Sequence, residues 1–301
     1  MGKLVGLATL ILTACILGVA VLAAAVARGG SPQGDGSTTA TRPGAGSSLP
    51  AGRAALDRSA AATCPGLSWS ILAAIGTVES DSGRSTAPGV ASGANAAGAE
   101  GPMQFEPATF TAYAVVGPGG VRPASPYDPV DAVYTAAAML CADGGGTPAG
   151  LRGALFAYNH AGPYVDAVLT LALAYADDPG ADGVVVTALL FATAQLGAPY
   201  LWGGNGSGGF DCSGLSRAAF GAAGVPLPRV AQGQFDAGPA VGDGAVVRPG
   251  DLVYFGSGPS GVDHVGIYVG GGLMVDAPHS GAVVRLEPAD WPGFVGATRP
   301  G

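Results

Sequence analysis

The segment 177–183, which holds three aspartates, two glycines and one proline, divides this chain into two parts of different character. Before it, successive patterns of apolar residues with helical spacing run through 67–173, including 131–142 and 151–175, and predict a compact, mostly helical domain. A Gly/Pro-containing acidic run interrupts such a pattern, and 301 residues are enough for two domains at roughly 100–200 residues each. We therefore expect a linker over 177–186.

The part of the chain beyond this linker has a mixed pattern. Residues 187–196 and 212–223 predict helices on either side of a glycine-rich loop. Strand-like runs separated by glycine clusters follow, at 251–256, 264–269, 273–277 and 283–287. Helices followed by an antiparallel sheet predict an α+β multidomain fold, with a mostly α-helical domain over 55–176 and an α+β domain over 187–301.

The amino-terminal residues 4–27 form an almost unbroken apolar run with one basic residue on each side. A bilayer span needs about 20 residues, and the apolar core of a cleaved signal peptide has only about 7–15. We therefore expect residues 1–28 to be a membrane helix that tethers an extracytoplasmic protein to the cell membrane. Two alternatives stay open: signal-peptidase cleavage at 25–27, which would release a secreted form, and lipid attachment at the lipoprotein-like sequence 12–15.

Residues 29–54 are rich in Gly, Ser, Thr and Pro and lack apolar periodicity. A segment of this composition cannot bury enough apolar surface to fold alone. It predicts a flexible linker that gives the following domains reach.

The charge pattern narrows the classes of partner and cofactor. The net charge is −8 and Lys3 is the only lysine, which excludes a basic face for nucleic acid and the lysine of a phosphate-binding loop. The sequence contains no Cys-x-x-Cys or His-Glu-x-x-His pattern, so we expect neither a metal site nor a cofactor.

The first candidate catalytic residue is Glu79. Ile71, Ile75 and Val78 mark the apolar face of a helix that begins near Ser68, and Glu79 lies four residues after Ile75 on that stripe. Burial and the negative end of the helix dipole both raise the pKa of a carboxyl group there, which favours a general acid near neutral pH. The helix position alone also fits a partly exposed helix-end residue.

Three motifs in order along the first domain resemble those of lytic transglycosylases of the lysozyme-like superfamily. They are Glu79-Ser80, Gly101-Pro102-Met103-Gln104-Phe105 and Ala157-Tyr158-Asn159, and the Gly-Pro-Met-Gln-Phe form is most similar to the membrane-bound murein transglycosylase branch. The resemblance implies that Glu79 protonates the glycosidic oxygen of peptidoglycan and then acts as a base. The sugar's own 6-hydroxyl would close on the anomeric carbon and leave a 1,6-anhydro end.

The resemblance also implies roles for the neighbours of Glu79. It implies that Gln104, Tyr158 and Asn159 line the sugar groove, that Met103 packs behind it and that Ser80 orients nearby groups. Plain core packing is the open alternative for Met103 and Tyr158.

One carboxylate suits this chemistry because none is needed as nucleophile or water activator. Asp81 does not face Glu79, since residues two apart on a helix point in different directions. Glu100 stays open as a second carboxylate, and with it plain muramidase hydrolysis.

The second candidate site lies in the α+β domain, where Cys212 begins a helical run after a glycine-rich loop. A helix amino end stabilises a thiolate and favours a nucleophile. His264 begins a strand whose period of two places it on the face of Gly266, with room beside it, and His279 follows on the next strand-to-turn segment. The residues alone equally fit a small buried thiol and two unrelated surface histidines.

Four motifs of this domain together are highly similar to NlpC-type cell-wall cysteine peptidases, whose fold is a reduced papain-like α+β domain. They lie at 198–204 (APYLWGG), 210–215 (FDCSGL), 248–255 (RPGDLVYF) and 264–268 (HVGIY), and the similarity covers nearly all of 187–297. It implies cleavage of peptidoglycan peptide stems, commonly between D-glutamate and a diamino acid.

The similarity carries roles onto individual residues. It implies Cys212 as the nucleophile, His264 as its base and His279 as the third polar residue. It places Tyr200 near the oxyanion or the substrate, with Asp211 and Ser213 also at the substrate, whereas we expect Trp202 to be a packing residue.

If Cys212 stays free, Cys64 and Cys141 are left as a pair outside the amino-terminal apolar run. A disulfide suits an exported domain made largely of alanine, and two buried thiols are the alternative.

The sequence as a whole thus predicts a tethered enzyme with two active sites on one polymer, peptidoglycan. The order of its parts resembles hydrolases of conjugative elements and secretion systems, which implies such a complex as a partner. Two alternatives stay open: a wall-binding scaffold with inactive sites, and an amidase or acyltransferase in the second domain.

Overall fold

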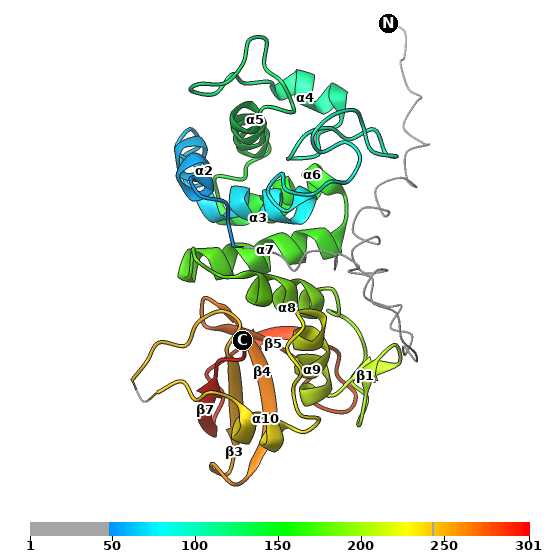
Figure 1. Cartoon of the computed structure of the whole chain (residues 1–301), viewed down its shortest axis with the longest axis vertical. Coiled ribbons are helices and arrows are strands. Elements are labelled where there is room, and N and C mark those ends of the chain that lie inside the picture. Colours follow the sequence, from blue (N-terminus) through cyan, green and yellow to red (C-terminus); the bar gives the residue numbers. More distant parts are fainter. Residues whose placement is uncertain (1–47, 243) are drawn as a thin grey trace, which may run out of the picture.

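The computed structural model describes residues 48–242 and 244–301, and it has a helical part followed by a part built on a sheet (Figure 1). The predicted anchor at 1–28 and residues 29–47 of the predicted linker at 29–54 lie outside the described residues. Within the described ranges, no helix is long and apolar enough to cross a membrane.

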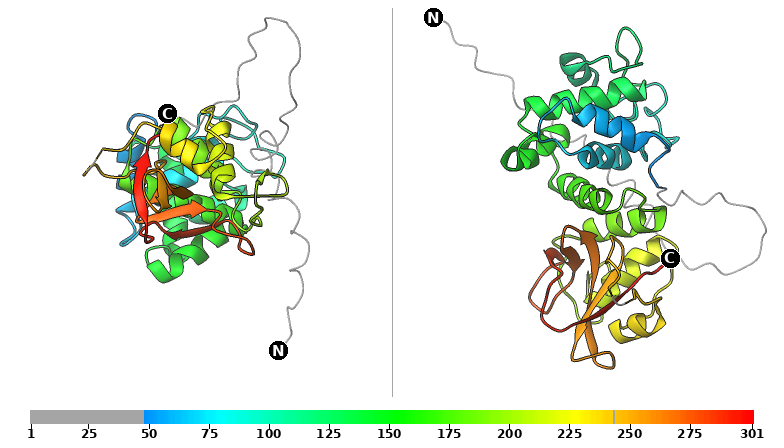
Figure 2. Two further views of the ribbon diagram at one scale, coloured as in Figure 1. Left: turned by 90° about the horizontal axis from the view of Figure 1, so that it is seen from below. Right: turned by 90° about the vertical axis from the view of Figure 1, so that its left-hand side faces the viewer.

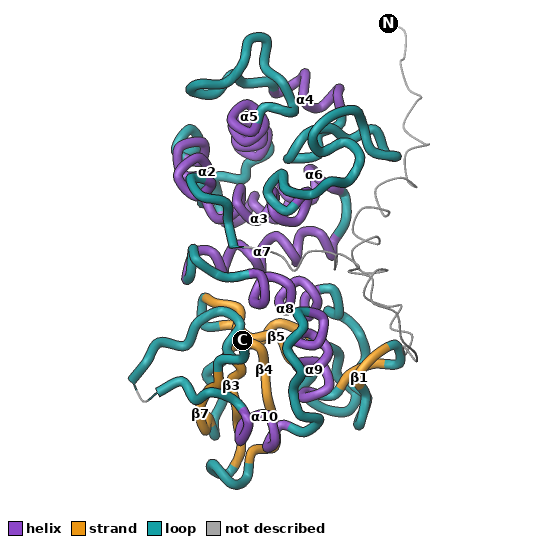
Figure 3. Tube along the Cα trace, viewed as in Figure 1, coloured by secondary structure: helices purple, strands orange, loops and turns teal. Residues whose placement is uncertain are grey.

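The helical part runs from α2 to α7, and α8 to α10 accompany the sheet. The helices are α2 (Arg53–Ala61), α3 (Trp69–Ser80), α4 (Pro107–Tyr113), α5 (Pro129–Ala142), α6 (Pro148–Asn159), α7 (Gly162–Asp177), α8 (Gly183–Thr193), α9 (Cys212–Ala222) and α10 (Ala231–Ala237). Figure 3 shows that every strand lies in the second part of the chain.

The five longer strands form one antiparallel sheet in the order β6-β5-β4-β3-β7. They are β3 (Leu252–Gly256), β4 (Val262–Gly270), β5 (Leu273–Asp276), β6 (Arg285–Pro288) and β7 (Phe294–Thr298), while β1 (Asn205–Gly206) and β2 (Gly209–Phe210) form a small separate hairpin. The predicted α+β pattern is therefore present, with β7 as a strand that the sequence analysis did not anticipate.

Side-chain caps explain where several helices begin. Ser68, Asp182 and Asp211 each stand just before a helix (α3, α8 and α9) and accept a hydrogen bond from a backbone N–H of its first turn. The cap at Asp182 starts α8 at Gly183, so the predicted linker 177–186 is shorter than expected. Likewise α2 begins at Arg53, inside the predicted linker 29–54.

The predicted helical stretch 151–175 is in fact two helices, α6 and α7. His160 ends α6 in the left-handed conformation with φ 55°, and Pro163 stands in the first turn of α7. Proline lacks the N–H that a continuous helix would need there, so the apolar periodicity runs on while the backbone turns.

The two parts share one hydrophobic core. A continuous cluster of buried residues extends from α3 and α5 through α7 and α8 to the helix-facing side of the sheet. Helix α7 contacts both α3 and β4, and Figure 2 shows α7 and α8 between the remaining helices and the sheet. Gly271, in the β4–β5 turn, donates a backbone hydrogen bond of 2.9 Å to the Asp177 carboxylate at the end of α7.

Candidate active sites

Glu79 lies in the last turn of α3 with its side chain partly exposed. Burial raises the pKa of its carboxyl group from an ordinary 4.5 to about 7, and hydrogen bonding by Tyr164 and Asn159 acts in the opposite direction. The carboxyl group is thus protonated in a substantial fraction of molecules at neutral pH, which is what a general acid requires.

Two polar groups face Glu79 from neighbouring helices. Asn159 is the last residue of α6, and Tyr164, which the sequence analysis missed, lies in the first turn of α7. The buried Asn159 Oδ1 and Tyr164 hydroxyl make no hydrogen bond of normal geometry to another described residue. Their contacts with Glu79 are thus looser than ordinary hydrogen bonds, as is common for catalytic groups without substrate. The ring of Tyr164 stacks on that of Tyr158 at 6.4 Å.

The segment 101–105 forms a tight turn beside the end of α3. Gly101 has φ 76°, and a Cβ there would collide with the Pro126 carbonyl, so only glycine fits. The Ser80 hydroxyl donates to the Pro102 carbonyl at 2.6 Å, and the Tyr158 hydroxyl donates to the Met103 carbonyl at 2.8 Å. Ser80 therefore holds this turn against α3, which carries Glu79, and Tyr158 holds it against α6.

The Gln104 side chain is held within the same turn. Its Nε2 donates to the Gly101 carbonyl at 2.7 Å, and its Oε1 accepts from Asn95 Nδ2 at 2.9 Å. Gln104 has φ 49°, a left-handed conformation that is uncommon for residues with a side chain. The amide predicted to line a sugar groove is thus already engaged in fixing the loop.

A buried ion pair that the sequence analysis did not find lies beneath the site. Arg53 on α2 donates to Asp57 at 2.9 Å, and its second terminal nitrogen reaches the Leu72 carbonyl and the Met103 sulfur, both at 3.4 Å. Burial raises the pKa of Asp57 to about 6, against the lowering effect of Arg53. Met103 is fully buried, which fits packing behind the site.

The two other carboxylates near Glu79 in sequence have other partners. Asp81 ends α3 in the left-handed conformation and pairs with Arg84 at 2.6 Å. Glu100 is a hydrogen-bond partner of Tyr127. Among the described residues, neither carboxylate contributes to the pKa of Glu79.

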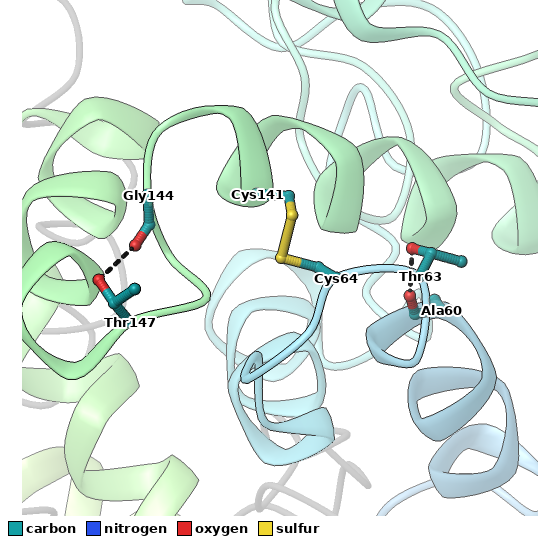
Figure 4. Close-up of a disulfide and its surroundings, with 6 residues drawn as sticks. All are labelled: Ala60, Thr63, Cys64, Cys141, Gly144 and Thr147. Carbon is teal, nitrogen blue, oxygen red and sulfur yellow. Dashed lines mark hydrogen bonds between the residues drawn. A yellow bond between two sulfur atoms is a disulfide. The ribbon is translucent and has the colours of Figure 1, made fainter.

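Cys64 and Cys141 form a disulfide that joins the loop after α2 to the last turn of α5 (Figure 4). Within the described residues Cys212 is the one cysteine outside a disulfide.

In the sheet-containing part, Cys212 is the first residue of α9 and is partly exposed. Asp211 caps this helix by accepting a hydrogen bond of 2.7 Å from the Gly214 N–H. The thiol lies at the positive end of the helix dipole, 4.0 Å from the Asp263 carbonyl at the start of β4. This position suits a thiolate nucleophile.

His264, the next residue, is buried on β4. Its Nε2 lies 2.8 Å from Asp276 Oδ2, which leaves Nδ1 for the Cys212 thiol. Burial lowers the pKa of His264, but hydrogen bonding to Asp276 and to Cys212 raises it more, so that the pKa reaches about 9. The imidazole is therefore placed to carry a proton beside the sulfur.

The third polar residue is Asp276, and the expectation for His279 was wrong. Asp276 is fully buried at the end of β5, next to the strand that carries His264. The chain then leaves the sheet, so His279 is exposed and its Nδ1 donates to the Ser280 carbonyl at 3.1 Å. The space expected beside His264 is also filled, because Met274 lies over Gly266.

Asp211 and Ser213 are bound by an arginine that the sequence analysis missed. Arg229 donates to both Asp211 oxygens, at 3.0 and 2.7 Å, and to the Ser213 hydroxyl at 3.1 Å. The Gly203 N–H also donates to Asp211, at 2.9 Å. These contacts fix the start of α9, and with it Cys212.

Two aromatic residues precede this helix. Burial raises the pKa of the Tyr200 hydroxyl, and the charges of Cys212 and Asp211 raise it further. Trp202 is 84% exposed, so the expectation of a packing residue was wrong.

Comparison with known proteins agrees with the division into two parts. Residues 58–168 match the family described as "Transglycosylase SLT domain", and residues 197–294 match the NlpC/P60 family. A probable endopeptidase of Mycobacterium tuberculosis is 42% identical over 121 residues, which are 40% of this chain and 30% of that protein. A Bacillus cereus protein named gamma-D-glutamyl-L-lysine dipeptidyl-peptidase is 35% identical over 124 residues, 39% of this chain and 34% of that protein.

Among solved structures, the peptidoglycan hydrolase RipB from Mycobacterium tuberculosis is 38% identical, with a TM-score of 0.35, and the match covers 38% of this chain and 64% of that one. This chain spans only about a third of the length of the two curated relatives.

Proposed function

Since this chain carries a transglycosylase SLT domain followed by an NlpC/P60 domain, we propose that it is a peptidoglycan hydrolase with two active sites. Glu79 cleaves glycan strands and Cys212 cleaves peptide stems. The observation that carries the proposal is the presence in one molecule of two complete catalytic groupings: a carboxyl group with a pKa near neutrality and a thiol–imidazole–carboxylate triad.

At the glycan site, the proton held by Glu79 goes to the oxygen of the scissile glycosidic bond as that bond breaks. The carboxylate so formed then removes the proton of the sugar's 6-hydroxyl, whose oxygen bonds to the anomeric carbon and gives a 1,6-anhydro end. This route needs no second carboxylate, which fits the separate partners of Asp81 and Glu100. Asn159 would contact the sugar next to Glu79, and the buried Tyr164 would hold the carboxyl group in place.

Digestion of purified peptidoglycan in water labelled with oxygen-18 tests this route. Transglycosylation produces anhydro ends without the label, whereas muramidase hydrolysis places one labelled oxygen at each new reducing end. Labelled reducing ends that disappear in Glu79→Gln would replace the transglycosylase proposal by hydrolysis.

At the peptide site, the Cys212 thiolate attacks the carbonyl carbon of the stem peptide. Imidazolium His264 gives its proton to the leaving amine, and Asp276 holds the ring in place. The resulting thioester is hydrolysed by water that His264 deprotonates. We propose the D-glutamyl–diamino acid bond as the target, which is supported by the name of the Bacillus cereus relative.

A synthetic stem peptide with an L-Ala–γ-D-Glu–diamino acid backbone tests this assignment. The expected products are the two fragments on either side of the γ-D-glutamyl bond, formed by the native chain and by Glu79→Gln but not by Cys212→Ala. A muropeptide that keeps its sugar tests the amidase alternative, because release of its intact stem from the sugar would indicate an amidase.

We also propose that residues 4–27 tether the protein on the outer side of the cell membrane, where a conjugation or secretion complex would be its partner. The length and apolar character of this run support the tether. Fractionation of cells that express the full chain, compared with a chain lacking residues 2–28, tests it. Full-chain protein found only in the medium would favour the secreted alternative.

A further inference from the structure

One face of the His264 imidazole is covered by aromatic rings that the proposed chemistry has not used. Trp291, in the segment between β6 and β7, stacks on the imidazole with 5.0 Å between ring centroids and 22° between the ring planes. Phe255 on β3 lies 6.0 Å from the imidazole and 5.5 Å from Trp291. These three rings contact one another, and Phe255 and Trp291 belong to a small apolar cluster separate from the main core.

The charged neighbours of His264 come from two other elements. Asp276 on β5 and Cys212 on α9 are the groups whose charges act on its pKa. Asp263 and Asp290, which precede His264 and Trp291 in the sequence, are exposed. From β3 and the segment before β7, the rings of Phe255 and Trp291 face the imidazole.

A stacked indole acts on a histidine in two ways. Its π face carries partial negative charge, so it stabilises a cation over the ring and favours imidazolium over neutral imidazole. Its flat surface also restrains rotation of the imidazole. With Nε2 at Asp276, restraint of the ring plane keeps Nδ1 directed toward Cys212.

We propose that Trp291 is a positioning residue of the thiol peptidase, which stabilises the imidazolium partner of the Cys212 thiolate and fixes the plane of the His264 ring. The catalytic role of this pair rests on the proposed peptidase function. The effect on protonation does not, because it can be measured on the resting protein.

The test compares Trp291→Leu, which removes the aromatic face, with Trp291→Phe, which keeps a smaller one. Phe294→Leu is the matched control: Phe294 contacts Phe255 at 6.0 Å ring separation, but it makes no ring contact with the imidazole. The pKa of His264 is measured in the full chain by NMR with carbon-13-labelled histidine. The pH dependence of Cys212 alkylation is followed in parallel by mass spectrometry of the peptide that contains it.

In Trp291→Leu we expect the pKa of His264 to fall by about half a unit, the size of one cation–π contact. The upper limit of the pH range in which Cys212 alkylates as a thiolate–imidazolium pair should move down equally. Trp291→Phe should show a smaller fall, and Phe294→Leu none. An unchanged His264 pKa in Trp291→Leu would overturn the proposal, even if peptidase activity drops.

Fluorinated tryptophan covers the case in which Trp291→Leu does not fold. Fluorine weakens the negative face of the indole with little change in shape. Incorporation throughout the chain should lower the His264 pKa in the native sequence but not in Trp291→Phe, which keeps Trp69 and Trp202. An equal response in the two proteins would assign the effect elsewhere. Neither readout needs substrate, so failure of the peptidase proposal would be seen separately, in the stem-peptide digest.

Discussion

Replacement of Glu79 by glutamine should stabilise the protein at alkaline pH. The folded state raises the pKa of this carboxyl group from 4.5 to about 7, so between these pH values the folded protein holds a proton that the unfolded chain has lost. The contribution of Glu79 to the free energy of unfolding is therefore highest below pH 4.5 and is lost as pH rises through 7. At about 1.4 kcal/mol for each pH unit, the carboxylate costs about 3 kcal/mol above pH 7, an upper value because the side chain is partly exposed.

Urea denaturation of the full chain at pH 5 and pH 8.5, followed by circular dichroism, measures this cost. Glutamine keeps the shape of glutamate without the charge, so Glu79→Gln should exceed the free energy of unfolding of the native protein by less than about 1 kcal/mol at pH 5 and by up to about 3 kcal/mol at pH 8.5. Glu106→Gln is the matched control, because Glu106 is exposed at the start of α4 and makes no side-chain cap bond. Its effect should be small and the same at both pH values.

The stability difference between Glu79→Gln and the native protein must therefore grow with pH. A difference that is constant between pH 5 and 8.5, or a variant less stable than the native protein at pH 8.5, would refute the claim that burial holds this carboxyl group protonated. The general-acid role would then lose its physical basis.

Three further outcomes are expected. Asp276→Asn should lower the pKa of His264 from about 9 toward its ordinary 6.5, because the charged acceptor is lost; NMR titration measures it, and an unshifted pKa would contradict the triad. Cys64→Ala combined with Cys141→Ala should lower the free energy of unfolding by up to about 4.5 kcal/mol, since the bond closes a loop with a sequence separation of 77; equal urea midpoints would contradict it. Asp177→Ala should cost about 1 kcal/mol and leave one unfolding transition by calorimetry, because the two parts share a core; two separate transitions in the native chain would contradict that coupling.

The spacing of apolar residues within single elements was sufficient to place Glu79 and His264 on a face of their helix and strand. The apolar stripe of α3 placed Glu79 at the end of a buried face, and a strand period of two placed His264 opposite Val265 and Ile267, which pack toward the helices. Both inferences depend only on residues within one element. The order of helices and strands was predictable for the same reason, since each element carries its own periodicity.

Contacts between distant elements could not be read from spacing. Asp276 reaches His264 because β5 pairs with β4, and the sequence did not show that β5 ends at Asp276 and sends His279 into solvent. Arg229 contacts Asp211, and Tyr164 contacts Glu79, from segments that are separate in the sequence. The sequence did contain one signal for Asp276, because it is a charged residue inside an otherwise apolar strand-like run.

The exposure of Trp202 is a second limit of local reasoning. The Gly203 N–H donates to Asp211 and fixes the turn after Trp202, and in this turn the side chain is 84% exposed. Tertiary hydrogen bonding here outweighs the preference of the side chain for burial.

The central claim is that one chain makes two independent cuts in peptidoglycan. The most direct test is mass analysis of the fragments that the full chain releases from purified peptidoglycan, beside Glu79→Gln, Cys212→Ala and the double variant. We expect anhydro-sugar ends to be lost only when Glu79 is replaced, cut peptide stems to be lost only when Cys212 is replaced, and no fragments from the double variant. Anhydro ends and cut stems that persist in the double variant, or intact peptidoglycan after treatment with the native chain, would contradict the account.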